Sequence, residues 1–271
     1  MAVIEIENLT RDYGRGRGVF DLSFEVQAGE AFGFLGPNGA CKTTTIRHLM
    51  GFIKPKQGRV TINGFDCWND RVKIQSAVGY IPGEIAFFHD MTGAEYLRFL
   101  AKYRGTGNAK QAELTERFEL DDSSPIKKMS KGTKQKLGIV AAFMHNPNIL
   151  ILDEPSSGLD PLMQSRFIEW IDEEKKHGKT VLMSSHMFEE VERTCHRIGI
   201  IRKGRLVALD LASSLQEKHA RTYTVTLEDE ASAARFAADF DGQQNGLQVT
   251  VRPKQSLERI FLDYYEEVPR D

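Results

Sequence analysis

The clearest candidates for chemistry lie between Gly36 and Thr44, where the sequence reads GPNGACKTT. The apolar residues 31–35 before it predict a buried parallel strand, and the residues from Lys42 onward predict a helix. A strand, a glycine-containing loop and a helix in this order direct backbone N–H groups and the positive end of the helix dipole toward an anion. Lys42 would then reach the terminal phosphates of a nucleotide, and the Thr43 hydroxyl would bind its magnesium. The stretch therefore predicts a phosphate-binding loop.

One position departs from the phosphate-loop pattern G-x-x-x-x-G-K-[ST]. Cys41 stands where the pattern has its second glycine. Glycine is favoured there because the backbone passes close to phosphate and a Cβ would crowd it. We therefore expect ATP to bind more weakly than it would with glycine. Three interpretations stay open: a natural variant, a residue introduced for labelling or cross-linking, and a mutation that abolishes turnover.

A second set of reactive side chains follows two other apolar runs. Residues 149–152, ILIL, predict a buried strand, and Asp153 and Glu154 come directly after it. Two carboxylates at the end of a buried strand are costly unless a cation or a reaction uses them. His186 follows the predicted strand over residues 180–183. Because ligands of open parallel sheets bind at the C-terminal ends of the strands, we expect these groups to meet the phosphate loop there.

Two further stretches carry side chains suited to binding. Residues 129–135, MSKGTKQ, begin a predicted helix with Ser130 as the expected N-cap, so this helix start also favours an anion. Tyr13 lies in an Arg- and Gly-rich loop, residues 10–18, between two predicted strands. A loop aromatic could stack on adenine, although position alone favours an ordinary, partly exposed tyrosine.

The rest of the chain must position these groups. Alternating or apolar runs predict strands over residues 3–9, 20–26, 59–63, 78–81, 198–201 and 205–209. Helical periodicity predicts helices over residues 95–104, 109–118, 134–145, 161–176 and 188–197. The first three of these helices predict a helical insert, over about residues 85–145, within an α/β domain. Phe87 and Phe88 are expected in the core of that insert.

The pattern changes after about residue 210. Strands over residues 223–227 and 247–252 alternate with helices over 231–240 and 256–265, the last with Ser256 as its expected N-cap. The sequence therefore predicts a domain over residues 1–215 and a small α+β accessory domain over residues 216–271.

Composition limits the protein class. The chain has 271 residues, 41% of them hydrophobic, and a formal net charge of −2, so charge alone does not favour a nucleic acid or an anionic membrane as partner. Three widely spaced cysteines indicate a reducing compartment rather than a disulfide framework. The N-terminus has no signal-peptide pattern, and no stretch reaches the roughly 18 apolar residues of a spanning helix. We expect a cytoplasmic protein whose membrane role, if any, comes through a partner.

The remaining histidines are expected to be structural or solvated; they are His48, His89, His145, His177, His196 and His219. Cys195 and His196 are adjacent on a predicted helix. Because adjacent helical side chains do not share a face, no metal site is expected there.

These motifs together resemble the ATP-binding cassette (ABC) ATPases, the nucleotide-binding subunits of ABC transporters. The resemblance covers residues 1 to about 215, with the motifs in the family's order and spacing. It implies an α/β P-loop NTPase fold with an antiparallel β subdomain and a helical insert. ATP and Mg²⁺ are the implied cofactors.

The resemblance also implies a role for each matching residue. Glu154 matches the general base, His186 the switch histidine, and Asp153 the carboxylate that, with Thr43, holds magnesium. Tyr13 matches the aromatic residue that stacks on adenine. The loop residues that match the phosphate cradle are Gly36, Pro37, Asn38, Gly39, Ala40, Cys41, Lys42, Thr43 and Thr44. Ser130 and Gly132 match the signature that binds the nucleotide of a second cassette, and Asp160 matches the loop that links the two sites.

Two stretches depart from the common family form. Lys131 and Thr133 differ from the usual signature, in a form that resembles the bacterial exporter branch. Gly83 stands where most cassettes have a glutamine that contacts magnesium and the membrane subunit. No side chain from position 83 can therefore reach the metal.

The resemblance implies an ATPase that works as a dimer of cassettes, identical or mixed, around two ATP molecules. The pair would drive a separate transmembrane permease from the inner face of the membrane, with export favoured and no nucleic-acid partner. Two alternatives stay open. One is a soluble ABC ATPase outside transport, and the other is a regulatory subunit that binds nucleotide and is disabled by Cys41.

Overall fold

The computed structural model describes residues 1–88, 90–105, 108–218, 220, 222–253 and 256–265. The chain divides into two compact units, Met1–Leu209 and Asp210–Asp271. Among the described residues, no helix is long and apolar enough to cross a membrane.

Unit 1 contains two sheets. The antiparallel sheet has the order β2-β1-β4-β5, formed by Gly18–Gln27, Ala2–Asp12, Gln57–Ile62 and Phe65–Asp66. The second sheet has the order β10-β9-β3-β8-β7-β6, formed by Arg205–Leu211, Arg197–Arg202, Ala31–Leu35, Thr180–Ser185, Ile149–Asp153 and Val78–Ile81. Its strands from β9 to β6 are parallel, so their C-terminal ends lie at one edge.

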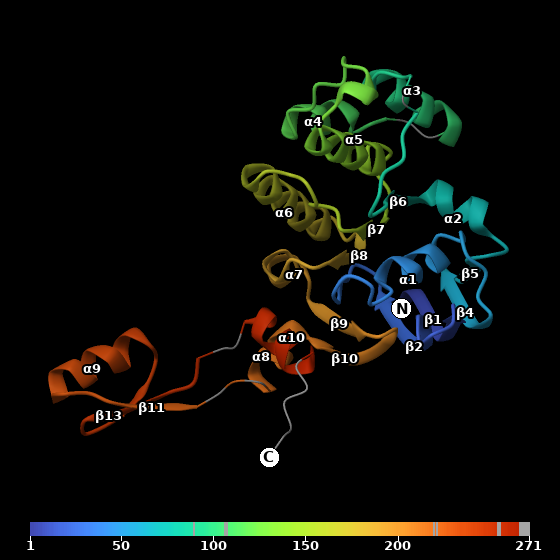
Figure 1. The fold of residues 1–271 in the computed structure, drawn as a ribbon. Coiled ribbons are helices and arrows are strands. Elements are labelled where there is room, and N and C mark those ends of the chain that lie inside the picture. The colour runs from blue at the N-terminus through green and yellow to red at the C-terminus, as the bar shows by residue number, and fades with distance from the viewer. Residues whose placement is uncertain (89, 106–107, 219, 221, 254–255, 266–271) are drawn as a thin grey trace. The chain divides into compact units, whose positions relative to one another are not determined.

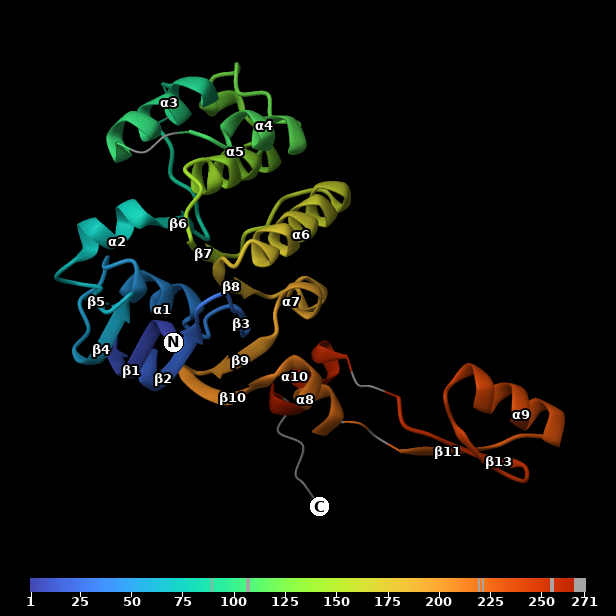
Figure 2. The ribbon, with the colours of Figure 1, turned by 180° about the vertical axis from the view of Figure 1, so that it is seen from behind.

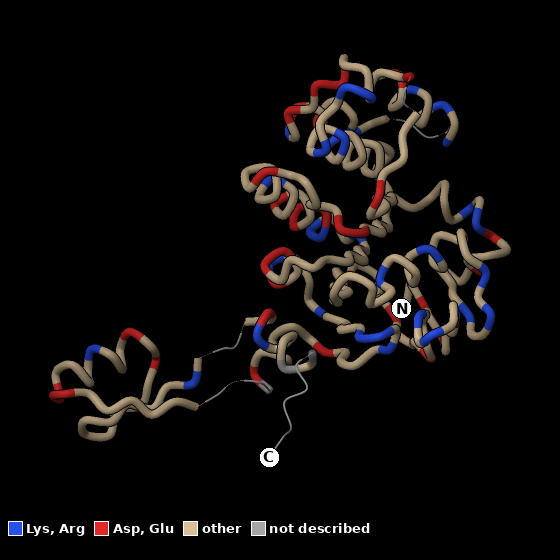
Figure 3. The backbone as a smooth tube through the Cα atoms, in the orientation of Figure 1, with Lys and Arg blue, Asp and Glu red and all other residues tan. Residues whose placement is uncertain are grey.

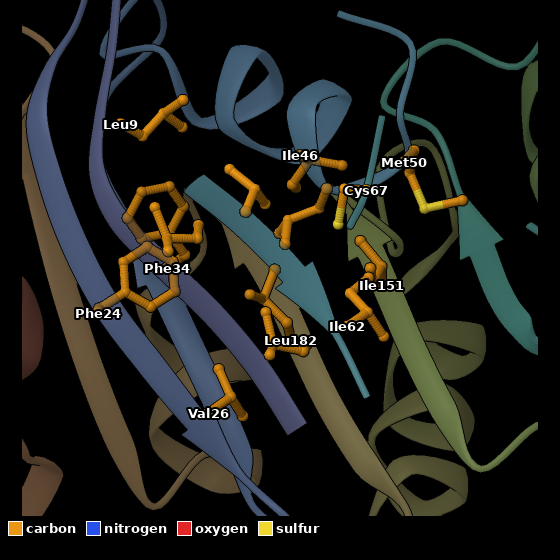
Figure 4. Packing of buried hydrophobic residues seen from close by; sticks show 14 of the residues in the cluster. Leu9, Phe24, Val26, Phe34, Ile46, Met50, Ile62, Cys67, Ile151 and Leu182 are labelled. Carbon is orange, nitrogen blue, oxygen red and sulfur yellow. The ribbon is translucent and has the colours of Figure 1, made fainter. Parts of the chain in front are cut away.

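The core of unit 1 joins the two sheets through helix α1, Lys42–Leu49 (Figure 4). Phe24 of the antiparallel sheet stacks on Phe32 of β3, with ring centroids 5.0 Å apart. Ile46 of α1 packs in the same cluster as Ile151 and Leu182. Because α1 is fixed in this core, the loop before it is fixed as well.

Helices cover the sheets and form the insert. After α1 come α2 (Arg71–Ala77), α3 (Gly93–Arg104), α4 (Gln111–Arg117), α5 (Lys131–Phe143), α6 (Pro161–Lys176) and α7 (Phe188–Thr194). Helices α3, α4 and α5 group together, apart from the antiparallel sheet (Figures 1 and 2). The Thr92 side chain accepts from the Glu95 N–H, and the Glu95 carboxylate accepts from the Thr92 N–H, so a capping box begins α3.

Unit 2 has two small parts. Helices α8 (Ala212–Lys218) and α10 (Leu257–Tyr265) contact each other. Helix α9 (Glu230–Asp239) packs on a sheet of order β11-β13-β12, formed by Tyr223–Thr226, Gln248–Val251 and Gln243–Asn245. Its small core consists of Ala233, Ala237, Val249 and Val251.

Several elements differ from those predicted. The helix predicted over residues 188–197 ends at Thr194, and Arg197 begins β9 instead. His196 therefore lies outside a helix. Helix α2 was not expected, because Ile74 is its only buried residue and one buried residue gives no periodic signal. Elements α8, β5 and β12 also went unpredicted. Of the two phenylalanines expected in the core of the insert, Phe87 is buried and Phe88 is exposed.

Candidate functional site

The phosphate loop connects β3 to α1, as predicted. Lys42 is buried, and its Nζ donates to the Gly36 carbonyl at 2.5 Å, which folds the side chain back over the loop. Gly36 has no room for a side chain, because a Cβ there would lie 2.7 Å from the Ile201 carbonyl oxygen. The loop is therefore held from both sides by β9 and by its own lysine.

Cys41 is the N-cap residue of α1 and has a left-handed backbone, with φ 79° and ψ 25°. A non-glycine residue in this region carries strain of about 1–2 kcal/mol. The Cys41 side chain caps no backbone N–H of α1; its Sγ lies 3.7 Å from the Gly39 carbonyl. The backbone conformation at this position thus favours glycine.

Asp153 ends β7 and is fully buried. Its Oδ1 accepts from the Ser184 hydroxyl of β8 at 2.5 Å. Its Oδ2 has no hydrogen-bond partner among the described residues. A buried carboxylate oxygen without a partner fits a bound cation.

A cavity of about 300 Å³ adjoins this carboxylate, with Thr43, Tyr80, Gly83 and Glu154 among its lining residues. A Cβ at Gly83 would lie 3.1 Å from Asp153 Oδ2, so the absence of a side chain at position 83 leaves more room beside this oxygen. Burial, and then the Asp153 charge, raise the pKa of Tyr80, which therefore stays neutral. Thr43 and Asp153 offer the oxygen ligands that Mg²⁺ prefers. No cluster of three or more His, Cys, Asp or Glu suited to a metal occurs in the described part of the chain.

Glu154 contacts two other predicted groups, Lys42 and His186. Its Oε1 lies 3.2 Å from Lys42 Nζ, and its Oε2 lies 2.5 Å from His186 Nδ1. The His186 backbone N–H also donates to Oε2, at 3.2 Å. Glu154 has a left-handed backbone, with φ 51°, and such strain is typical of functional positions. The phosphate loop, the end of β7 and the end of β8 therefore meet at one carboxylate.

The predicted signature and linking residues form a separate group. Ser130 is the N-cap of α5 and accepts from the Thr133 N–H at 3.1 Å, and Asp160 is the N-cap of α6 and accepts from the Met163 N–H at 3.0 Å. A Cβ at Gly132 would lie 2.9 Å from the Gly158 carbonyl oxygen, so these two stretches are in close contact. In the described part of the chain, no hydrogen bond or ion pair joins Ser130, Gly132 or Asp160 to the Glu154 cluster.

Tyr13 lies in the turn between β1 and β2 and is 52% exposed. The Arg11 guanidinium lies 5.3 Å from the centre of its ring. One face of the ring can thus be occupied by a cation while the ring stays open to solvent.

The remaining histidines are mostly structural. His48 is fully buried and its Nδ1 lies 2.8 Å from the Thr44 carbonyl, while burial lowers its pKa. His145 Nδ1 lies 2.9 Å from Arg104 Nη1, and burial lowers the pKa of His145 to about 4. His177 is exposed, whereas His89 and His219 lie outside the described residues.

Sequence reasoning missed two residues near this site. Ser184 orients Asp153, and Glu190 is a buried carboxyl that accepts from the Ser185 hydroxyl at 2.6 Å. The polar pair Ser184-Ser185 at the end of an apolar strand was a signal for the first. Glu190 gave none, because it stands among charged residues in the sequence FEEVERT.

Comparisons with known proteins show the family of this chain. The family model described as "ABC transporter" matches residues 19–157. The linearmycin resistance ATP-binding protein LnrL of Bacillus subtilis (strain 168) is 37% identical over 219 residues, which cover 79% of this chain and 70% of that protein. The bacitracin transport ATP-binding protein BcrA of Bacillus licheniformis is 34% identical over 257 residues, which cover 90% and 83%.

Solved structures show the same fold. The structure described as "ATP binding subunit of ABC transporter" has a TM-score of 0.73 at 32% identity, covering 80% of this chain and 92% of that one. A post-hydrolysis dimer of the cassette MJ0796 with ADP and phosphate has a TM-score of 0.67 at 22% identity, covering 77% and 98%, and at this identity it supports the fold alone.

Proposed function

The chain belongs to the family of ABC transporter ATP-binding proteins and is an ABC ATPase, and we propose that it is the ATP-hydrolysing subunit of an exporter. The observation that carries this proposal is the meeting of Lys42, Glu154 and His186 at the edge where the parallel strands end. Two relatives named for resistance to or transport of antibiotics, LnrL and BcrA, favour export.

In the proposed reaction, Glu154 accepts the proton of the attacking water. Its two oxygens already have separate partners, so His186 can hold one while the other turns from Lys42 toward the water. Lys42 and the loop N–H groups would bind the phosphates, with the dipole of α1 behind them. Thr43 and Asp153 would hold magnesium, which supplies charge stabilisation to the phosphoryl transfer. Tyr13 would stack on adenine.

A second cassette would complete the site. Ser130, Gly132 and Asp160 are placed on helix starts but have no contact with the Glu154 cluster of their own chain. A composite site between two chains gives them a phosphate to bind, because the N-terminus of α5 favours an anion. We infer a dimer in which each chain supplies its phosphate loop to one site and its signature to the other.

A transmembrane partner would dock beside the helical insert. A cavity of about 540 Å³ with a largely apolar lining, including Phe52, Val72, Leu100 and Tyr103, lies between α2 and α3. Phe88 and Phe99 extend the exposed aromatic surface along the insert, with ring centroids 5.5 Å apart. Exposed apolar surface of this kind favours a protein partner. Acidic and basic residues are mixed on the insert and on α6, which does not favour nucleic acid (Figure 3).

The disabled regulatory subunit is the weaker alternative. Cys41 lies in the loop, but Lys42, Asp153, Glu154 and His186 are all present and the last two are in contact. None of the relatives named above is described as a regulatory or inactive subunit.

The test is turnover of ATP by the purified chain with Mg²⁺, measured as release of ADP and phosphate in equal amounts. We expect Lys42→Ala to weaken ATP binding by at least roughly tenfold, because charge-assisted hydrogen bonds to phosphate are lost. Lys56→Ala, at an exposed lysine outside the loop, is the matched control and should bind as the parent does. The proposal fails if the parent chain neither binds nor hydrolyses ATP.

A further inference from the structure

Glu190 is a buried carboxyl beside the catalytic groups that the proposed mechanism does not use. It lies in the first turn of α7 and is 1% exposed. Its neighbour Glu189 is an exposed carboxylate, as most acidic side chains are. A buried carboxyl is unfavourable unless its contacts require it, so these contacts indicate its role.

The first contact fixes the turn that carries His186. Ser185 ends β8, and its hydroxyl donates to Glu190 Oε2 at 2.6 Å. The same hydroxyl accepts from the Met187 N–H at 2.9 Å. Since Glu190 takes the Ser185 proton, the oxygen of Ser185 is directed at Met187. The backbone on both sides of His186 is therefore held by one hydroxyl whose direction Glu190 sets.

The second contact leads to the segment after Glu154. Ser156 is buried, and its hydroxyl lies 3.7 Å from Met187 Sδ. Ser156, Met187 and Glu190 line the same cavity, so the carboxyl adjoins both segments, and the Ser185 and Ser156 hydroxyls both lower the pKa of Glu190. Glu154 and His186 are themselves joined at 2.5 Å. Through these two segments, Glu190 supports the Glu154–His186 pair, which the proposed mechanism places beside the attacking water.

The surroundings of Glu190 make its charge sensitive to pH. Burial raises its pKa to about 7, and the Glu154 charge adds to this, while His186 and the two hydroxyls act in the opposite direction. Its Oε1 has no hydrogen-bond partner among the described residues, and Glu190 lines a cavity of about 170 Å³ between α6 and α7. The charged or titratable groups around it are Glu189 and Arg193 on α7, Cys195 after α7, Glu154 after β7 and His186 after β8. Helix α6 contributes only uncharged side chains to the cavity.

We propose that Glu190 is a positioning residue for ATP hydrolysis, which holds the His186 turn against the Glu154 segment and couples this hold to pH through its own ionisation. The Ser185 hydroxyl donates more strongly to a carboxylate than to a neutral carboxyl. The hold is therefore tighter above neutral pH than below it. This inference rests on the proposed roles of Glu154 and His186.

The experiment measures kcat and ATP affinity of the full chain between pH 6 and 8 for the parent, Glu190→Gln, Glu190→Ala and the matched control Glu189→Gln. Glutamine keeps a neutral acceptor for Ser185 and cannot ionise. We expect kcat of Glu190→Gln to equal the parental value at pH 6 and to be roughly fivefold below the parental value at pH 8. At pH 8 the parent offers Ser185 a charged acceptor, whereas the variant offers a neutral one, which accepts a weaker hydrogen bond. Titration of ATP itself is common to all four proteins, so the ratio of parent to variant isolates Glu190.

Alanine removes the acceptor at every pH. We expect kcat of Glu190→Ala to be lower by roughly 10- to 100-fold at both pH values, with ATP affinity within about threefold of the parent. Glu189→Gln should follow the parent throughout. A ratio of parent to Glu190→Gln that is the same at pH 6 and 8 would overturn the proposal, as would a parental kcat in Glu190→Ala. If Glu190→Ala does not fold, the glutamine variant still decides the matter. An inactive parent chain would instead refute the proposed function.

Discussion

The two sides of the phosphate site are built in different ways. The loop side, residues 36–44, offers mainly backbone N–H groups and a single cation, and its backbone is strained at Cys41. The opposite side, at the ends of β7 and β8, is a set of side chains that hold one another, from Ser184 through Asp153 to Glu154 and His186. Changes on the loop side should therefore alter ATP binding, and changes on the opposite side should alter turnover.

The largest expected effect comes from the carboxylate side. Glu154→Gln should lower kcat by roughly 10²- to 10⁴-fold, because an amide cannot accept the proton of water. ATP affinity should stay the same or rise by about threefold, since Lys42 loses the ion pair at 3.2 Å that competes with phosphate. Single-turnover hydrolysis and binding of a fluorescent ATP analogue separate the two quantities.

Glu84→Gln is the matched control, since Glu84 lines the same cavity and is exposed. It should keep the parental kcat. A Glu154→Gln variant that lost binding and kept its turnover of bound ATP would break the division between the two sides.

The next largest effect comes from the loop side and concerns ATP binding rather than turnover. Cys41→Gly should tighten ATP binding by roughly tenfold with little change in the turnover of bound ATP, because glycine adopts φ 79° without strain and brings no Cβ near phosphate. Equilibrium binding of ATP measures the first quantity, and turnover at saturating ATP measures the second.

Cys41→Ala separates the backbone from the thiol. Alanine keeps the Cβ and the left-handed strain but removes Sγ, so we expect it to bind ATP as the parent does. If alanine gained as much affinity as glycine, the sulfur atom would be the cause and the backbone argument would be wrong. Equal affinity in all three proteins would contradict the predicted weakness at position 41.

How far the sequence predicts this molecule depends on the kind of signal. Residues 78–81 and 161–176 have the predicted bounds, since an apolar run and a long amphipathic period are both local patterns. The Ser130 N-cap is local in the same sense. Contacts such as Ser184 with Asp153 depend on the pairing of β7 with β8, and no local pattern determines which way the side chains point.

Two features of the site illustrate what local patterns leave out. The phosphate-loop pattern identified Cys41 as the departure, but its left-handed backbone is visible only in the folded loop. The family resemblance predicted roles for Glu154 and His186, whereas only the fold shows that the two side chains are in contact. In the sequence, Glu190 looks like one of several surface carboxylates, and only the fold shows that it is buried.

The smallest expected effect concerns folding stability and separates the pH response of the site from that of the rest of unit 1. His145 has a folded-state pKa of about 4, below the unfolded value of 6.5, so its contribution is present above pH 6.5 and is lost as pH falls toward 4. Glu190 has a folded-state pKa of about 7, above the unfolded value of 4.5, so its contribution is present at low pH and is lost as pH rises through 7. The two groups therefore act in opposite directions between pH 6 and 8.

A variant at either position should reveal how the other group changes stability with pH. From pH 6 to pH 8, the free energy of unfolding of His145→Gln should fall by about 1 kcal/mol, and that of Glu190→Gln should rise by about 1 kcal/mol, while the parent changes less than either. Denaturant unfolding at the two pH values measures this. Parallel changes in all three proteins would show that neither group titrates as its burial indicates. A rise confined to Glu190→Gln, together with the lower kcat expected of this variant at pH 8, would assign the pH response of the catalytic side to that one carboxyl.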